Sequence, residues 1–480
     1  MSKQQWSMTN SLAFDLVLVC FAIILITSPV WFDLNDILYN LDGIRSYLIN
    51  NFIPPNSSQY WLLVPLGIIG TWRWSVWIIK KATATVYTPL EPAINSDNVQ
   101  KTSHLTFAII TPVYNEDSIV FGKALNSWWE NKPDELIAVI DKSDKACIQV
   151  FNEFRELKAN LKLIVTSKPG KRAALADGIQ ESRCDIVALV DSDTIWGPDI
   201  RDKVLAPFQR DSSIGGVTTR QHPISRRSLW QKMTDVFWDM RNYYDLPSQT
   251  VAGQALSCLS GRTSLYRREI LLPRLHLFLN EIILGRKKES GEDKCLTRII
   301  QKLGWKTYYQ SNAVVYSSAA SDFTTFWSQR LRWSRNSHNS DFVSLWDGWA
   351  WHHPYLAFFM LDRFISTFTL FLGPIFFGIA LLNHQWLFAS LIVLLWIIGR
   401  GIKILPHLRR RPDDIILLPI YVAINFLVAL TKLYALVTIR DQRVIRGSKQ
   451  YTKNFLSKVK DYLLTGEIIF SIIIIAAVFR

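Results

Sequence analysis

Two long apolar runs stand near the start of the chain, at residues 11–32 and 60–79. Each is long enough to cross a bilayer as a helix. No small-residue cleavage site follows the first run, so we expect a helix that stays in the protein and not a signal peptide. Lys80 and Lys81 close the second run, and basic residues favour the cytosolic side of a membrane. We therefore expect both the N-terminus and the chain after residue 81 to lie in the cytosol.

After residue 81 the pattern changes to short β-branched runs that alternate with amphipathic helical stretches. This alternation is typical of an α/β domain with a mostly parallel sheet, in which ligand sites lie at the carboxyl ends of the strands. The predicted strands cover residues 105–111, 136–140, 161–166, 186–190 and 216–219, and the predicted helices include 118–130 and 171–183.

Apolar spans return at residues 358–382 and 386–404, followed by the basic cluster Arg409–Arg411 on the predicted cytosolic side. Residues 415–439 form another long apolar segment. If it crossed the membrane fully, the basic stretch 440–460 would be exported, which opposes the orientation set by the other basic residues. We therefore expect a re-entrant or interfacial element at 415–439.

The expected organisation has three parts. Of the 480 residues 49% are hydrophobic, which disfavours a purely cytosolic protein. The parts are two N-terminal transmembrane helices (1–81), a cytosolic domain with interfacial helices (82–345), and C-terminal transmembrane and interfacial helices (346–480) that end in a short span at 468–479.

The net charge of +14 and the five cysteines narrow the possible partners. The basic residues lie mainly beside apolar segments and form no Lys/Arg tract or nucleic-acid motif, so we expect membrane lipids and a phosphorylated substrate and no nucleic acid. The cysteines show no metal-ligand spacing, and no zinc site is therefore predicted.

Candidate chemistry follows the predicted strand 186–190. Asp191 and Asp193 come directly after this strand, one residue apart. Carboxylate oxygens suit Mg²⁺ or Mn²⁺, hard ions that the protein and substrate phosphates hold jointly. An Asp-x-Asp pair is common, however, and alone it is as often a solvated loop pair as a metal site.

Other polar residues are expected at the same edge of the sheet. Asp141 follows the strand 136–140, and the segment 111–116 ends the first strand. Lys171 and Arg172 open a helix after the third strand, where cations and free backbone amides can meet a diphosphate. Each feature is weak alone, and together they predict a site for a nucleotide diphosphate.

Two later motifs have both a structural and a functional explanation. Glu292 and Asp293 open a predicted helix, where acidic residues serve as caps, or where one of them acts as a general base that deprotonates an acceptor hydroxyl. Gln329, Arg332 and Trp333 stand just before the third apolar span. An interfacial helix anchored by Trp and Arg would have the same pattern.

These motifs, in this order between apolar helices, resemble those of the processive inverting family-2 glycosyltransferases, the group of hyaluronan, chitin-oligosaccharide and cellulose synthases. Cys258-Leu259-Ser260-Gly261 and Leu265-Tyr266-Arg267 are similar to the acceptor-side motif of hyaluronan synthases, whereas Gly261-Arg262-Thr263-Ser264 and residues 215–219 are more similar to mannuronan (alginate) synthase. The shared motifs are Asp141, Gly170-Lys171-Arg172, Asp191-Ser192-Asp193, Gly291-Glu292-Asp293 and Gln329-x-x-Arg332-Trp333.

The resemblance implies a GT-A type α/β domain combined with an α-helical multi-pass transmembrane region, and it gives each motif a role. The implied roles are a nucleobase contact for Asp141, diphosphate contacts for Lys171 and Arg172, Mg²⁺ or Mn²⁺ ligands for Asp191 and Asp193, the general base for Asp293 or its neighbour Glu292, and acceptor contacts for Gly261, Tyr266, Gln329, Arg332 and Trp333.

Residues 441–447 resemble the cytosolic gating loop of the same group, which makes Arg446 a further expected donor contact. The loop departs from the pattern, because Arg443 stands where hyaluronan synthases have a tryptophan and Ile445 stands near their threonine. The sequence therefore leaves open how the loop closes over a substrate.

The implied reaction is a single displacement with inversion, in which a polysaccharide synthase of the plasma (inner) membrane extends a growing polysaccharide from a nucleotide sugar and passes it across the bilayer. Asp141 favours a UDP-sugar, because mannuronan-type relatives, which use a guanosine sugar, lack this residue. A GDP-mannuronate polymerase and a non-processive transferase to a membrane lipid remain alternatives, since ceramide glucosyltransferases share a related Arg-Trp motif. A transporter or scaffold that only binds nucleotide is disfavoured by Asp193, Asp293 and Trp333 together.

Overall fold

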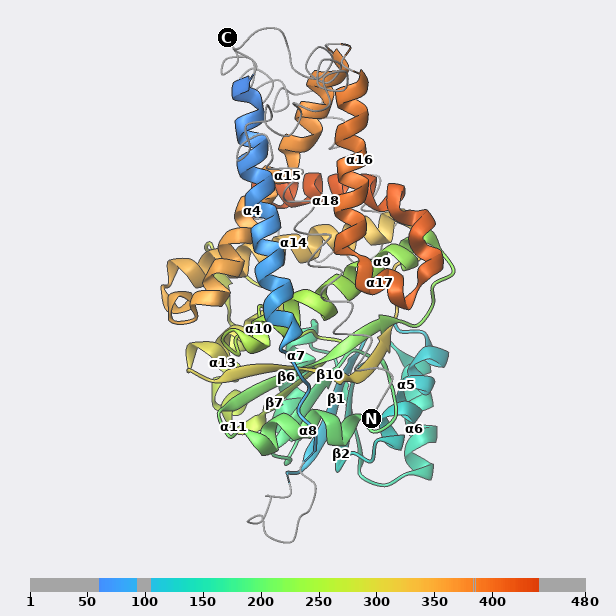
Figure 1. Ribbon diagram of the computed structural model, residues 1–480. Helices are drawn as coiled ribbons and strands as arrows, with labels where there is room; N and C mark the ends of the chain where they lie inside the picture. Colours follow the sequence, from blue (N-terminus) through green and yellow to red (C-terminus); the bar gives the residue numbers. More distant parts are fainter. Residues whose placement is uncertain (1–59, 93–104, 383, 385, 440–480) are drawn as a thin grey trace.

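The computed structural model describes residues 60–92, 105–382, 384 and 386–439. The expectations for the first apolar run, the loop at 440–460 and the last short span lie outside these residues. Figure 1 shows a sheet flanked by helices and, above it, a group of long helices from the segments that precede and follow the sheet domain in the chain.

The domain is built on an eight-stranded sheet with the strand order β3-β2-β1-β4-β7-β6-β10-β5. The pairs β1–β2, β2–β3, β1–β4 and β6–β10 are parallel, whereas β7 runs antiparallel to β4 and β6, and β5 runs antiparallel to β10. The predicted mostly parallel sheet is confirmed, with two antiparallel strands, β5 and β7, that were not among the predicted strands. The strands are β1 (Phe107–Val113), β2 (Glu135–Asp141), β3 (Leu161–Thr166), β4 (Ile186–Val190), β5 (Ile195–Trp196), β6 (Ile214–Pro223), β7 (Thr263–Arg267) and β10 (Lys306–Ser317).

Helices cover both faces of this sheet. Along β1, Phe107 and Ile109 pack into the core on one face, and Ala108 and Ile110 pack into the core on the other. Both sides of the strand are therefore buried, which explains its continuous apolar run. On the first face lie α5 (Ser118–Glu130), α6 (Lys145–Leu157) and α8 (Ile200–Arg210), and on the second lie α7 (Lys171–Glu181), α11 (Arg268–Leu271), α12 (Leu275–Leu279) and α13 (Glu292–Lys302).

Three helices begin at the carboxyl edge of the sheet, each at a residue suited to a helix start. The Asp117 carboxylate accepts hydrogen bonds from the backbone N–H groups of Ile119 (2.8 Å) and Val120 (3.1 Å) at the start of α5. Gly170 (φ 101°) precedes α7, and Gly291 (φ 78°) precedes α13. Both glycines adopt a positive φ that a residue with a side chain takes only with strain.

The flanking segments form the long helices. Among the described residues, Pro354–Leu382 and Pro412–Val437 are long and apolar enough to cross a membrane. The predicted spans 358–382 and 386–404 are helical in the structure. The helices of this region are α4 (Tyr60–Thr85), α9 (Leu229–Met240), α10 (Leu246–Val251), α14 (Phe323–Trp346), α15 (Pro354–Leu382), α16 (Trp386–Lys403), α17 (Leu405–Arg410) and α18 (Leu418–Val437), with the 3₁₀ turn η5 (Pro412–Leu417) before α18.

Two of these helices lie across the others. In Figure 1 α4 and α16 stand upright, whereas α14 and α18 run crosswise to them. The helices α14 and α18 pack against each other, and α18 also packs against α15 and α16. The segment expected to be re-entrant or interfacial is thus a helix that is long enough to span a membrane but lies crosswise to its upright neighbours.

Candidate active site

Asp191, Ser192 and Asp193 follow β4 directly, near the middle of the sheet between β1 and β7. The Asp193 carboxylate accepts a hydrogen bond from Ser317 Oγ, at the end of β10, over 3.3 Å. Burial, followed by the charge of Asp191, raises the pKa of Asp193 above its usual value. The two carboxylates therefore repel each other in a confined space. A divalent cation would relieve this repulsion, so the pair fits a hard metal ion that takes oxygen ligands.

Lys171, the first residue of α7, connects this strand end to α13. Its Nζ atom lies 2.6 Å from Asp191 Oδ1 and 2.7 Å from Glu292 Oε1. Burial alone would raise the pKa of Glu292, but the charge of Lys171 and its hydrogen bond lower it to about 2. Glu292 is therefore ionised at neutral pH and held by the lysine.

Lys171, Asp191 and Glu292 line a cleft. Asp293 also lines it. Its Oδ1 atom accepts a hydrogen bond from the backbone N–H of Lys294 (2.8 Å), so the Asp293 carboxylate also satisfies a backbone donor in the first turn of α13. A Cβ at Gly261 would lie 3.4 Å from Lys171 Nζ, so a glycine lets this loop come close to the lysine. The cleft is lined by Pro112, Lys171, Leu175, Leu189, Val190, Asp191, Gly261, Ser264, Glu292, Asp293 and Leu296.

The loops after β1, β2 and β4 meet beside the cleft. Ser192 Oγ donates a hydrogen bond to Glu116 Oε2 (2.7 Å), and the backbone N–H of Glu116 donates to Asp144 Oδ2 (3.2 Å). Asp141 ends β2, and its Oδ1 atom accepts hydrogen bonds from the backbone N–H (2.9 Å) and the hydroxyl (2.6 Å) of Ser143. Asp141 lies at the expected edge of the sheet but outside the cleft lining, and its nucleobase contact stays a prediction.

Arg172 does not face the cleft. Its guanidinium donates to the carbonyl oxygen of Phe278 (2.7 Å) and to Glu281 Oε2 (2.6 Å), and the side chain is buried. The side chains of successive helix residues point in directions about 100° apart. Because Lys171 points to the cleft, Arg172 points toward the interior. The predicted diphosphate contact is corrected accordingly: Arg172 holds α7 to the segment that carries α12.

Tyr266 does not face the cleft either. It is fully buried in the core between the sheet and α7, and it pairs with Val187 inside the sheet. Because β7 runs antiparallel to β4, only the start of β7 reaches the carboxyl edge of β4, and Ser264 near that start lines the cleft. The predicted acceptor contact of Tyr266 is corrected to a core position, whereas Gly261 lies in the cleft lining.

The remaining predicted acceptor residues lie on α14. Gln329 and Trp333 are half-buried, and Arg332 is exposed. The charge of Arg332 also helps to lower the pKa of Glu292, although burial and Lys171 have larger effects on that pKa. The helix α14 therefore passes close to the start of α13. Arg446 lies outside the described residues.

Sequence reasoning gave no role to two further residues beside the cleft. The guanidinium carbon of Arg262 lies 4.0 Å from the ring centroid of Trp238 and 5.4 Å from that of Trp333. Burial lowers the pKa of Arg262 to about 10, although the charges of Asp191 and Asp193 oppose this change. The place of Arg262 directly after Gly261 could have indicated it, but no sequence signal distinguishes Trp238 from the many other tryptophans.

Two buried ion pairs that share Asp341 connect α13 to two long helices. Lys294 Nζ lies 3.1 Å from Asp341 Oδ1 on α14, and Arg363 Nη1 on α15 lies 2.6 Å from Asp341 Oδ2. Asp341 is fully buried between them. The helix that carries Asp293 is therefore fixed relative to both α14 and α15 by ion pairs in the interior.

The comparisons with known proteins agree with this geometry. Residues 104–336 match the family described as "Glycosyltransferase like family 2". Hyaluronan synthases of Streptococcus pyogenes are 27% identical to this chain over 390 residues, which cover 78% of this chain and 89% of theirs. This chain carries a family-2 glycosyltransferase domain.

Other relatives of this glycosyltransferase are more distant. A type 2 glycosyltransferase of Gibberella zeae is 25% identical over 410 residues, or 80% of this chain and 75% of that one. The solved structure of a mannosyltransferase from Pyrobaculum calidifontis in complex with GDP-Man and Mn²⁺ has a TM-score of 0.53 at 17% identity, and the match covers 76% of this chain and 97% of that chain. This last likeness shows the GT-A fold. The expected family, the fold of the catalytic domain and the transferase activity are thereby confirmed.

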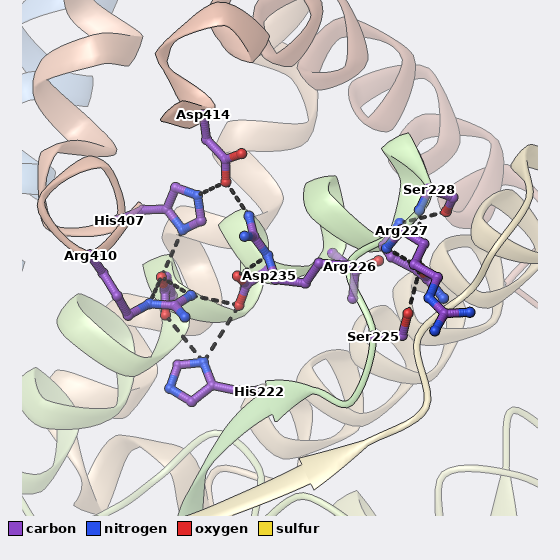
Figure 2. Close-up of polar contacts among 12 residues, drawn as sticks. His222, Ser225, Arg226, Arg227, Ser228, Asp235, His407, Arg410 and Asp414 are labelled. Carbon is purple, nitrogen blue, oxygen red and sulfur yellow. Dashed lines mark hydrogen bonds and ion pairs between the residues drawn. The ribbon is translucent and has the colours of Figure 1, made fainter. Parts of the chain in front are cut away.

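The glycosyltransferase contains a second group of acidic and histidine side chains, which shares no residue with the cleft lining (Figure 2). The ligand atoms of His222, Asp235 and Asp239 all lie within 4.8 Å of one another, close enough to hold a metal ion. Their charge is already matched, because Arg410 Nη2 lies 2.7 Å from both Asp235 Oδ1 and Asp239 Oδ2, and Arg226 Nε lies 2.7 Å from Asp235 Oδ2. A metal ion would have to displace these arginines.

His407 extends this group toward η5. Its Nδ1 atom lies 2.7 Å from Asp239 Oδ2, and its Nε2 atom lies 2.9 Å from Asp414 Oδ2. Burial would raise the pKa of Asp235, but the hydrogen bond of His222 and the charge of Arg410 lower it to about 2. The group therefore joins β6 and α9 of the glycosyltransferase domain to α17 and η5. We call it the buried network, with the members His222, Arg226, Asp235, Asp239, His407, Arg410 and Asp414.

Proposed function

We propose that this chain is a processive, inverting polysaccharide synthase that polymerises the sugar of a UDP-sugar at the cytosolic face of the plasma (inner) membrane and passes the polymer through a multi-pass helical region. The observation that carries this proposal is the cleft cluster, defined as Lys171, Asp191, Asp193, Glu292 and Asp293. Four of these residues line the cleft, Asp193 follows Asp191 on the same loop, and no ion pair to Asp293 is found among the described residues.

The donor side of the cleft rests on Lys171 and the two carboxylates after β4. Asp191 and Asp193 would hold Mg²⁺ or Mn²⁺ together with the donor diphosphate, and the ion would offset charge on the leaving group. The ammonium of Lys171, held 2.6 Å from Asp191 Oδ1, adds a fixed positive charge at the same place. These groups favour a substrate that carries a diphosphate.

The two carboxylates at the start of α13 differ in their suitability as a base. Glu292 is paired with Lys171 and has a pKa of about 2, so it takes up a proton poorly at neutral pH. Asp293 lines the cleft, and no ion pair to it is found among the described residues. Asp293 is therefore the better candidate to take the proton from the acceptor hydroxyl as it attacks the anomeric carbon.

The acceptor side is assigned to α14. Trp333 offers a flat apolar face for a sugar ring, and Arg332 lies close enough to the start of α13 to affect Glu292. The ion pairs of Asp341 fix α13 relative to this helix, which keeps the distance and orientation between the base and the acceptor constant. Two helices long enough to span a membrane follow α14, which supports a membrane-bound polymer and the three-part organisation expected from the sequence.

A donor screen tests this proposal. Purified protein is incubated with Mn²⁺ and with UDP-glucose, UDP-N-acetylglucosamine, UDP-glucuronate or GDP-mannuronate, alone and in pairs, and nucleotide release and product length are measured. We expect release from uridine donors and a product that lengthens with time, and a rate lower by on the order of 10²-fold or more in the Asp293→Asn variant. Release from GDP-mannuronate alone, or a product that extracts with lipid and stays one sugar long, would contradict the proposal.

A further inference from the structure

The loop before β7 lies directly against the donor side of the cleft. A Cβ at Gly261 would lie 3.7 Å from Asp191 Oδ1 and 3.4 Å from Lys171 Nζ. The carbonyl oxygen of the next residue, Arg262, accepts a hydrogen bond from the backbone N–H of Asp191 over 3.4 Å. The side chain of Arg262 therefore starts within one residue of the groups to which we assign the diphosphate.

The guanidinium of Arg262 is held by neutral groups. Its Nη1 atom donates hydrogen bonds to Gln221 Oε1 (3.0 Å) and Ser260 Oγ (3.4 Å). Its carbon lies 4.0 Å from the ring centroid of Trp238 and 5.4 Å from that of Trp333. Among the described residues, no carboxylate forms an ion pair or a hydrogen bond with it. The guanidinium is thus fixed in place without a directly bonded anion.

Three carboxylates beside the cleft nevertheless attract Arg262. Burial lowers the pKa of this guanidinium to about 10, and the charges of Asp191, Asp193 and Asp293 oppose the change. Arg262 is therefore a cation at neutral pH. Hydrogen bonds from a charged donor to a charged acceptor are stronger than those to a neutral one, so an anion that comes within reach would draw the guanidinium away from its neutral partners.

The donor diphosphate is the anion that the proposed function brings to this place. A metal ion would balance Asp191 and Asp193, so the charge of the diphosphate itself has to be matched by cations of the protein. Lys171 offers one such charge, which it shares with Glu292 at 2.7 Å. Arg172, the second cation expected from the sequence, points into the interior. A further cation is needed, and the loop that touches Lys171 carries one.

The observed place of the Arg262 guanidinium also affects the acceptor side. It lies over the ring of Trp333, where an acceptor sugar would stack. Arg330 lies over the same ring at 5.4 Å, but its guanidinium is closer to Phe237 (4.2 Å) and Phe326 (5.0 Å). The like charges of the two arginines repel each other. A shift of Arg262 toward an anion would relieve this repulsion and remove one guanidinium from the indole.

We propose that Arg262 is a further catalytic residue, whose guanidinium binds the leaving diphosphate and thereby moves off the Trp333 ring that receives the acceptor sugar. This inference rests on the proposed function and adds an order of binding to it, donor before acceptor. As the acceptor oxygen bonds to the anomeric carbon and gives its proton to Asp293, the bond from that carbon to the diphosphate breaks and leaves its electron pair on the diphosphate oxygen. Arg262 stabilises the charge that builds up there.

Binding of two nucleotides tests the diphosphate contact. Calorimetric titration in the presence of Mn²⁺ compares UDP with UMP, which lacks the second phosphate. We expect Arg262→Gln to weaken the binding of UDP by on the order of 10-fold and that of UMP by less than about threefold, and Arg262→Lys to recover part of the loss. In nucleotide release, kcat should fall by on the order of 10²-fold in Arg262→Gln. An unchanged ratio of the two affinities would overturn the inference.

Arg241→Gln is the matched control. Arg241 donates a hydrogen bond to the carbonyl oxygen of Cys258, on the same loop, over 2.8 Å, so this variant also removes a positive charge and a contact of the loop. It should keep the ratio of UDP to UMP affinity, and a drop equal to that of Arg262→Gln would overturn the specific role of Arg262. Binding of GDP in place of UDP would instead contradict the proposed donor, and the comparison of GDP with GMP would then test Arg262 in the same way.

The order of binding has a separate test. Saturation-transfer NMR reports contact of cellotetraose and chitotetraose, whose rings can both stack on an indole, with the protein. Contact should need UDP and Mn²⁺ in the unmodified protein and should appear without them in Arg262→Gln. General damage to the fold would weaken both nucleotide binding and sugar contact, whereas the inference predicts opposite changes. Equal contact with and without UDP in the unmodified protein, or no contact in Arg262→Gln, would overturn the link between Arg262 and Trp333.

Discussion

The cleft cluster and the buried network contain similar side chains in different states of charge pairing. In the network, three carboxylates contact two arginines and two histidines, and all three are buried. In the cleft cluster, the ion pairs found among the described residues join Lys171 to two of the four carboxylates, Asp191 and Glu292. The difference indicates that matched carboxylates hold elements together, whereas carboxylates short of a partner remain available for a metal ion or a proton.

The largest expected effect comes from Asp193→Asn in the cleft cluster. This change removes a proposed metal ligand and keeps the shape of the side chain, so donor binding that depends on Mn²⁺ should weaken and kcat/KM should fall by on the order of 10³-fold. Nucleotide release measured over a Mn²⁺ titration checks this outcome. An unchanged Mn²⁺ dependence would remove Asp193 from the metal site.

Lys171→Met should have the next largest effect. The charge of Lys171 holds Asp191 and Glu292 together, so its loss leaves two carboxylates without their shared partner and removes a positive charge beside the diphosphate. We expect kcat/KM to fall by roughly 10²-fold, with partial recovery in Lys171→Arg. Steady-state rates for both variants measure this, and full activity of the methionine variant would show that the lysine only fastens α7 to α13.

Asp239→Asn in the buried network should act on stability instead. It leaves Arg410 with Asp235 and His407 with Asp414 but removes the carboxylate that both contact in a buried place, which costs about 1–3 kcal/mol of unfolding free energy. Activity per folded molecule should stay within about threefold of the unmodified protein, because no catalytic group is touched. Thermal unfolding and rates measured on the same samples test this, with the exposed neighbour in Asp413→Asn as the matched control.

The smallest expected effect is that of His222→Ala on the metal requirement. His222, Asp235 and Asp239 are close enough to hold an ion, but the arginines already match the two carboxylates. The Mn²⁺ concentration for half-maximal activity should therefore be unchanged. A clear rise in that concentration would place a functional metal in the network and break the contrast with the cleft.

The sequence predicted the cleft better than the network for a physical reason. Strand ends of a parallel sheet share one edge, so Asp191 could be placed beside Lys171 from strand order alone, whereas Glu292 received its place only through the family resemblance. The network joins His222 to His407 and Asp414, which lie on segments far apart in the chain with no common periodicity. Such contacts depend on how the long helices pack on the domain.

Side-chain direction was the other limit of prediction. A motif places neighbouring residues together, but Lys171 and Arg172 leave α7 in different directions, and only the lysine reaches the cleft. The antiparallel direction of β7 likewise sends Tyr266 into the core. Arg262 was part of a recognised motif, yet its contact with Trp333 requires the packing of α14 over the loop.

The central claim, that the carboxylate of Asp293 in the cleft takes the proton of the acceptor, is tested most directly with Asp293→Asn. This change keeps the shape of the side chain and removes the proton acceptor, so the account predicts normal folding, normal binding of the UDP-sugar in the presence of Mn²⁺, and a transfer rate lower by on the order of 10²-fold or more. Binding by calorimetry and transfer by nucleotide release are measured on one preparation. Near-normal transfer, or loss of folding and donor binding together, would contradict the account.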